Sequence, residues 1–100
     1  MIHVIATIEV RDGTRDQFLR EFHRLAPIVR DEDGCIEYVP VIDRATSVSE
    51  PPRANVITLI EKWSNYEALE AHLQAPHMVR YRNTVKDLIV SLRIQVFDPA

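Results

Sequence analysis

The sequence predicts an α+β domain of the ferredoxin-like class, a split βαβ fold with the order β-α-β-β-α-β and a four-stranded antiparallel sheet. Three observations predict this class. Four apolar runs have the length and alternation of strands, two amphipathic helical patterns lie among them, and turn residues separate the segments. Because one hundred residues form one hydrophobic core, residues 1–100 are expected to be a single domain.

The first strand and the first helix are predicted by their apolar spacing. Residues 2–10 alternate and predict a strand, which Asp12-Gly13 ends with a turn. Thr14 and Gln17 form a capping box, which marks the start of a helix. The apolar stripe of this helix consists of Phe18, Phe22, Leu25 and Val29.

Proline and glycine punctuate the next part of the chain. Pro27 is expected either to kink the first helix or to start a second short segment. Gly34 fits the C-cap of this helix. Residues 35–42 predict the second strand, in which Pro40 indicates an edge position or a bulge.

A polar loop, residues 43–54, leads to the third strand at residues 55–63. Ser64 and Glu67 form a second capping box, and the helix that follows is expected to end near Gln74.

The last part of the chain is predicted to be a further helix and the fourth strand. Pro76 suits the first position of a continuing helix, which is expected to reach about Val90. Residues 92–97 predict the last strand.

The third strand is apolar on both faces, and this predicts an oligomer. Ile57 and Leu59 lie on one face, whereas Val56 and Ile60 lie on the other. Two helices cover only one face of a sheet, and a large bare apolar patch is unusual on a monomer. We therefore expect a homodimer in which two sheets pack together, in the manner of a dimeric α+β barrel.

Composition excludes several classes of function. The net charge of −3 and the scattered arginines predict no binding to nucleic acid, and no apolar run is long enough for a membrane span. The two glycines form no GxGxxG or Walker-type loop, so we expect no dinucleotide or ATP site. The single cysteine fits a reducing cytoplasm.

His72 and His77 flank Pro76 and are the first candidates for catalysis. Imidazole titrates near neutral pH, so either side chain could act as a general base. The alternative is a structural histidine that bonds to a backbone carbonyl where the helix is interrupted.

Glu61 shares a strand face with Trp63 and is the third candidate. If that face meets the helices, burial will raise the pKa of the carboxyl or require a partner. An ion pair with an arginine, or a position at the strand end that reaches solvent, are the alternatives.

The aromatic side chains could form the wall of a pocket for a flat ring. The candidates are Trp63, Tyr38, Tyr66 and Tyr81, and for each the alternative is a place in the ordinary core. No metal is expected, because the histidines are five residues apart across a proline and no further ligands complete a shell. Cys35 is a weaker candidate, as a nucleophile, since no histidine lies near it in sequence.

Three blocks resemble the antibiotic biosynthesis monooxygenase family, and small bacterial quinol monooxygenases in particular. They are Asp33-Gly34-Cys35 shortly before Tyr38, IEKW at residues 60–63, and LEAHLQAPHM at residues 69–78. The resemblance implies a dimeric barrel with a substrate cleft between sheet and helices. It also implies oxidation of a hydroquinone or polyketide-like ring by O₂ without flavin, haem or metal. His72 or His77 would then be the base.

Two further functions remain open for the same residues. A related branch of enzymes isomerises a small phosphorylated, sugar-like signal molecule and shares the AHxxxPH pattern, found here at residues 71–77. Arg80 and Arg82 are candidate phosphate ligands for such an isomerase. The other possibility is a non-enzymatic dimer that binds an aromatic ligand. Haem-degrading members carry an asparagine on the first strand. This chain has none there, which argues against haem degradation.

Overall fold

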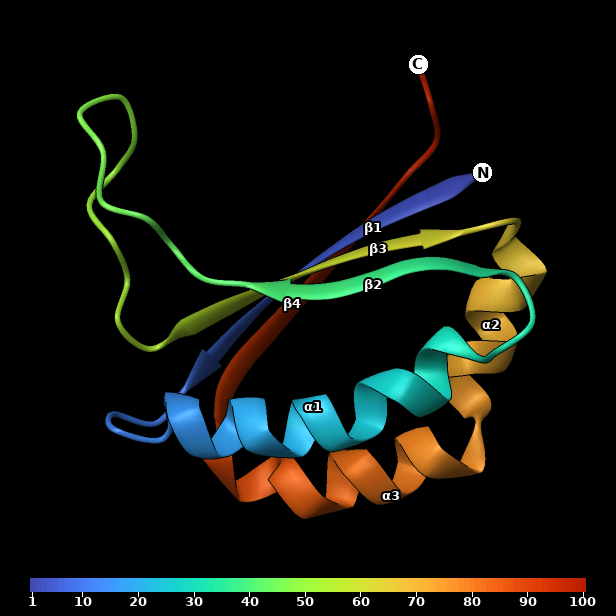
Figure 1. The fold of residues 1–100 in the computed structure, drawn as a ribbon, viewed down its shortest axis with the longest axis horizontal. Helices are drawn as coiled ribbons and strands as arrows, with labels where there is room; N and C mark the ends of the chain where they lie inside the picture. Colours follow the sequence, from blue (N-terminus) through green and yellow to red (C-terminus); the bar gives the residue numbers. More distant parts are fainter.

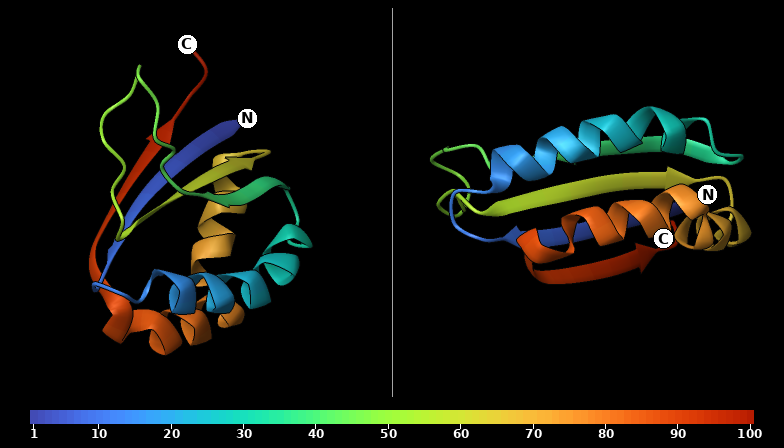
Figure 2. Two further views of the ribbon diagram at one scale, coloured as in Figure 1. Left: turned by 60° about the vertical axis from the view of Figure 1, so that its left-hand side comes forward. Right: turned by 90° about the horizontal axis from the view of Figure 1, so that it is seen from below.

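All helices lie on one face of a four-stranded antiparallel sheet in the computed structural model, which describes residues 1–100 (Figures 1 and 2). The strand order is β2-β3-β1-β4, so β1 and β3 are central, and β2 and β4 are the edges. The elements are β1 (Ile2–Val10), α1 (Arg15–Arg30), β2 (Cys35–Val41), β3 (Val56–Trp63), α2 (Tyr66–Gln74), α3 (Pro76–Val85), the 3₁₀ turn η1 (Lys86–Leu88) and β4 (Ile89–Phe97). This confirms the predicted fold class.

The hydrophobic core lies between the inner face of the sheet and the helices. Alternate residues of β1, from Val4 to Val10, point inward and are buried, as the period of a strand requires. They meet the buried stripe of α1, which includes Phe18, Phe22 and Val29. Full burial of one such aliphatic or aromatic side chain contributes roughly 1.5–3 kcal/mol. This packing positions β3 and α2, which carry the polar residues of the interior.

Both predicted capping boxes are wrong. Thr14 precedes α1, but its hydroxyl donates to the carbonyl of Arg11, at 2.7 Å, instead of accepting from the helix. At the second helix the N-cap is Asn65, whose Oδ1 accepts from the amide of Ala68 at 2.8 Å, and not Ser64. Asparagine is among the best N-cap residues, and here it displaces the neighbouring serine.

α1 continues through Pro27 as one helix, so no second segment begins there. A proline in the last turn removes only one hydrogen bond within the helix. The expected C-cap at Gly34 is also wrong, because the helix ends at Arg30 with Asp31 as its C-cap. Gly34 instead has φ +83° in the turn before β2, and a Cβ there would lie 2.6 Å from Cβ of Ala68. This glycine therefore allows the turn to approach α2 closely.

The end of α3 differs from the prediction. The helix that was expected to reach about Val90 ends at Val85, and β4 begins at Ile89. Ile89 pairs with Val10, and the amide of Arg11 donates to the carbonyl of Leu88 at 2.8 Å. Pairing with the end of β1 therefore draws these apolar residues into the sheet.

The outer face of the sheet carries no helix and exposes apolar side chains. Ile5, Val39 and Phe97 are each about two-fifths exposed, with Ile60 between them in the central part of the sheet. Pro40 lies in the edge strand β2, as predicted, and a bulge interrupts the pairing of β2 between Cys35 and Glu37. None of the helices is long and apolar enough to cross a membrane.

Candidate active site

A cavity of about 110 Å³ lies between the inner face of the sheet and the helices. Thirteen of its sixteen lining residues are hydrophobic, and the other three are Glu61, His72 and Arg82. Leu92 and Ile94 of β4 line the cavity and are half exposed, so the cavity lies close to solvent along β4. An apolar cavity of roughly 150 Å³ holds benzene, so this smaller one has room for no more than a single ring.

Glu61 is a carboxyl group within this apolar layer. The alternation of β3 turns Leu59, Glu61 and Trp63 inward together, and Glu61 is only 6% exposed. Its Oε1 accepts a hydrogen bond from Nε1 of Trp63 at 2.9 Å. Burial raises the pKa of Glu61 to about 7, the hydrogen bond from Trp63 opposes the rise, and the charge of Glu32 adds to it. Glu61 therefore exchanges a proton near neutral pH.

His72 reaches the same cavity from α2 and is 2% exposed. Its ring lies against Trp63, with the centroids 4.7 Å apart, and at 5.4 Å from the ring of Tyr38. Burial lowers the pKa of His72, and contact with Glu32 partly opposes this effect. His72 is therefore a buried imidazole that is neutral at physiological pH.

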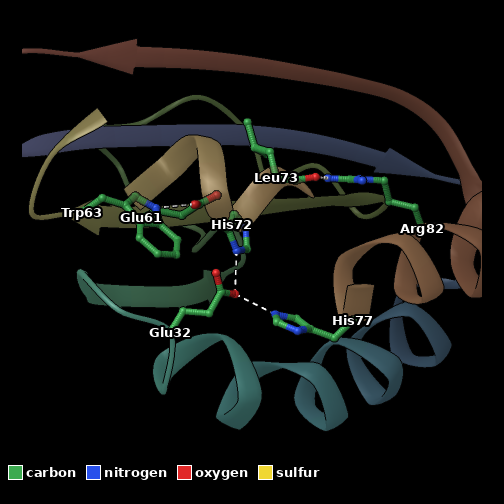
Figure 3. A network of polar contacts seen from close by, with 7 residues as sticks. All are labelled: Glu32, Glu61, Trp63, His72, Leu73, His77 and Arg82. Atoms are coloured by element: carbon green, nitrogen blue, oxygen red, sulfur yellow. Dashed lines mark hydrogen bonds and ion pairs between the residues drawn. The ribbon is translucent and has the colours of Figure 1, made fainter. Parts of the chain in front are cut away.

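Glu32 joins the two histidines, as Figure 3 shows. Its Oε2 lies 2.9 Å from Nδ1 of His72 and 2.8 Å from Nε2 of His77. Glu32 lies in the turn between α1 and β2, forty residues before His72. The sequence does not predict this role of Glu32, because the acidic run Asp31-Glu32-Asp33 contains no local signal that separates it from its neighbours.

Two of the four aromatic candidates line the cavity. Tyr38 stacks on Phe22, with ring centroids 5.1 Å apart, and Tyr81 packs edge-on against Phe18 at 6.1 Å. The hydroxyl of Tyr81 is buried and has no hydrogen-bond partner. A buried polar group without a partner is rare and costly, so this hydroxyl is free to bind a polar atom of a ligand.

The remaining candidates do not line the cavity. Trp63 is fully buried behind Glu61 and His72, so it supports the wall without forming its surface. Tyr66, the first residue of α2, is half exposed and lies away from the cavity. His77 touches Glu32 from the outer side, where its side chain is 18% exposed.

Arg82 adds a cation at the cavity, and its Nη2 donates to the carbonyl of Leu73 (Figure 3). Arg80 lies elsewhere, in a surface depression with His77. Burial raises the pKa of the Cys35 thiol, and Glu32 and Glu61 raise it further. A raised thiol pKa disfavours the nucleophilic thiolate. No group of three or more His, Cys, Asp or Glu side chains has the arrangement of a metal site.

The chain belongs to the antibiotic biosynthesis monooxygenase family, whose pattern matches residues 1–84. It is 39% identical over 102 residues to the Escherichia coli protein named "Probable quinol monooxygenase YgiN", an alignment that covers 99% of this chain and 98% of the relative. The structure of PA3566 from Pseudomonas aeruginosa is 27% identical, with a TM-score of 0.82 over 99% of this chain and 93% of that one.

A conserved protein from Methanosarcina mazei shows the same fold at lower sequence identity. It is 20% identical, with a TM-score of 0.85, and the match covers 99% of this chain and 92% of that protein. At this identity the likeness establishes the fold alone.

Proposed function

We propose that this protein is a monooxygenase that oxidises a small hydroquinone, or a related polyketide-like ring, with O₂ and without a bound cofactor. The observation that carries the proposal is the pair of proton-exchanging groups, His72 and Glu61, on the wall of an apolar cavity sized for one ring. The name of the Escherichia coli relative, which is 39% identical, supports a quinol as the substrate.

The chemistry of such a reaction needs a base more than it needs a cofactor. Removal of a hydroxyl proton makes a hydroquinone electron-rich enough to reduce O₂ directly. The overall reaction balances as hydroquinone plus O₂ giving hydroxyquinone plus water, so the substrate itself supplies all the electrons. In this proposal His72 takes the proton, and Glu61 exchanges a proton with the second oxygen of the ring or with reduced oxygen.

The cavity wall supplies the remaining requirements. Its mostly apolar lining reduces the contact of a bound ring with water, which strengthens electrostatic interactions with the anionic substrate. The free hydroxyl of Tyr81 supplies a hydrogen bond to a ring oxygen. Arg82 lines the same cavity and favours a substrate that becomes negative.

Oxygen uptake with a panel of single-ring and fused-ring hydroquinones tests the proposal. We expect saturable uptake that survives dialysis against a chelator, with single rings preferred. Turnover that does not require O₂ would contradict the proposal and indicate an acid–base enzyme for a small carbonyl compound. Saturable binding without any turnover would contradict it too, and would indicate an aromatic-ligand-binding protein.

We also propose that two copies pair through the outer face of the sheet. The exposed apolar side chains Ile5, Val39 and Phe97 support this arrangement, since no helix covers them. Light scattering at micromolar concentration should give twice the chain mass of 11.6 kDa. The variant Ile5→Lys should shift the mass towards the monomer, and a wild-type monomer would contradict the pairing.

A further inference from the structure

We propose that Glu32 is the positioning residue of the site, which holds His72 in the one tautomer that can accept a proton from the cavity side. This inference rests on the proposed function in so far as His72 acts as the base. It assigns a role to a residue that lies outside the cavity lining and forty positions away in the chain.

The hydrogen bond between Glu32 and His72 determines the tautomer of the imidazole. Oε2 of Glu32 lies 2.9 Å from Nδ1 of His72, and an ionised carboxylate only accepts hydrogen bonds. Nδ1 must then carry the proton that it donates. Because a neutral imidazole carries one proton, Nε2 is left with a free lone pair, and it belongs to a ring that lines the cavity.

His77 holds the Glu32 carboxylate from the other side. Its Nε2 lies 2.8 Å from the same Oε2, so the carboxylate oxygen receives hydrogen bonds from two imidazoles. Two contacts on one oxygen fix the orientation of the Glu32 carboxylate. His77 approaches from α3 and His72 from α2, so Glu32 also links the two helices that Pro76 separates.

Charged groups from two parts of the chain surround His72. The groups that act on His72 are Glu32 from the turn after α1, and His77 and Arg82 from α3. Tyr38 and Trp63, which pack against its ring, are neutral, and Glu61 lines the same cavity from β3. Glu32 is thus the anion in direct contact with His72. A buried imidazolium without such a partner would be strongly disfavoured.

The proton transfer that follows is balanced. The O–H bond of the substrate breaks, its electron pair stays on the substrate oxygen, and the proton forms a bond with Nε2 of His72. The proton on Nδ1 stays in place, and Glu32 remains ionised beside the new imidazolium. Glu32 therefore orients the base and stabilises its charged form, as the carboxylate does in a Ser-His-Asp triad.

Glu32→Gln tests the role, because it keeps the size of the side chain and removes the charge. We expect kcat to fall by roughly 10²-fold with little change in KM, which is the pattern of a lost transition-state interaction. Loss of the anion should also lower the pKa of His72 and move the acid limb of the pH profile to lower pH. Glu32→Asp should be more active than Glu32→Gln, and Asp33→Asn, the matched loss of one exposed charge nearby, should keep full activity.

The tautomer of His72 gives a readout that needs no substrate. Long-range ¹H–¹⁵N correlation spectra should show His72 protonated on Nδ1 in the wild type, and shifted towards the Nε2–H form in Glu32→Leu, whose side chain has no acceptor. An Nε2–H tautomer in the wild type would overturn the inference, as would an unchanged tautomer in the variant. If oxygen uptake is absent but the tautomer responds as stated, the proposed function fails while the positioning role stands.

Discussion

Glu61 and Asp43 are both carboxyl groups with hydrogen-bond donors close by, but they lie in opposite environments. Glu61 is buried on the inner face of the sheet and has one neutral donor, Nε1 of Trp63. Asp43 lies in the surface loop between β2 and β3, where the backbone amide and the guanidinium of Arg53 donate to it at 2.8–3.0 Å. The pKa of Glu61 is raised to about 7, whereas that of Asp43 is lowered to about 2.

The difference shows that desolvation without a countercharge is what makes a carboxyl group reactive at neutral pH. The hydrogen bonds from Arg53 lower the pKa of Asp43. The attraction between the two charges adds less, because water screens it at the surface. At Glu61 one indole N–H cannot replace the lost hydration, so the acid holds its proton. Glu61 is therefore suited to proton transfer. The Asp43–Arg53 pair instead joins the two ends of the surface loop between β2 and β3.

The largest expected effect comes from the inner region. His72→Asn should lower kcat for oxygen uptake by roughly 10²-fold or more, because the proton acceptor is lost. His23→Asn is the control, since His23 is exposed on α1 and should leave uptake unchanged. Full activity in His72→Asn would show that His72 is not the proton acceptor of the reaction.

The next effect is on stability and compares the two carboxyl groups directly. A raised pKa means that the folded state holds the proton more tightly, so the stability from Glu61 is complete below pH 4.5 and is lost as the pH rises through about 7. From this shift, the free energy of unfolding of the wild type, measured with urea, should fall by about 3 kcal/mol as the pH rises through this range. The variant Glu61→Gln should not show this fall. His72 has a lowered pKa and opposes this slope equally in both proteins.

Fluorescence offers a second measurement of the same titration. Trp63 is the only tryptophan, and its Nε1 donates to Glu61, so its emission should change with a midpoint near pH 7. The change should be absent in Glu61→Gln. A midpoint below pH 5 in the wild type would mean that Glu61 behaves as an ordinary surface acid, and the contrast with Asp43 would disappear.

His77→Asn should have a smaller effect, because Glu32 keeps its contact with His72. We expect roughly a three- to tenfold loss of kcat, below the roughly 10- to 100-fold that loss of a direct orienting partner costs. A loss as large as that of His72→Asn would contradict this order of effects and place His77 in the proton transfer as well.

The smallest effect is expected in the surface loop. Asp43→Asn should leave oxygen uptake unchanged, and its difference in stability from the wild type should stay constant between pH 5 and pH 8. The sign follows from the lowered pKa, since the stability from Asp43 is present above pH 3.8 and is lost only as the pH falls through about 2. A pH-dependent difference within that range would show that the loop pair is coupled to the interior.

The local patterns of the sequence were sufficient for the bounds of β1 and for the face on which Glu61 lies. Alternation predicted the bounds of β1 and placed Glu61 and Trp63 on the same side of β3. The helical break at Pro76 was also predicted, because proline removes a donor wherever it stands. These features depend on residues close together in the chain, so periodicity and backbone chemistry decide them.

The tertiary structure decided which polar residues meet. Nothing near Glu32 distinguishes it from Asp31 and Asp33, and only the packing of α1 against β2 and of α2 over β3 brings its carboxylate to His72. Long-range packing likewise placed Trp63 behind the cavity wall, and pairing of Ile89 with β1 limits α3, which ends at Val85. The sequence by itself determined which titratable side chains the strands and helices carry. Folding decided their partners and raised the pKa of Glu61 towards neutrality, because burial and contact arise only between distant segments.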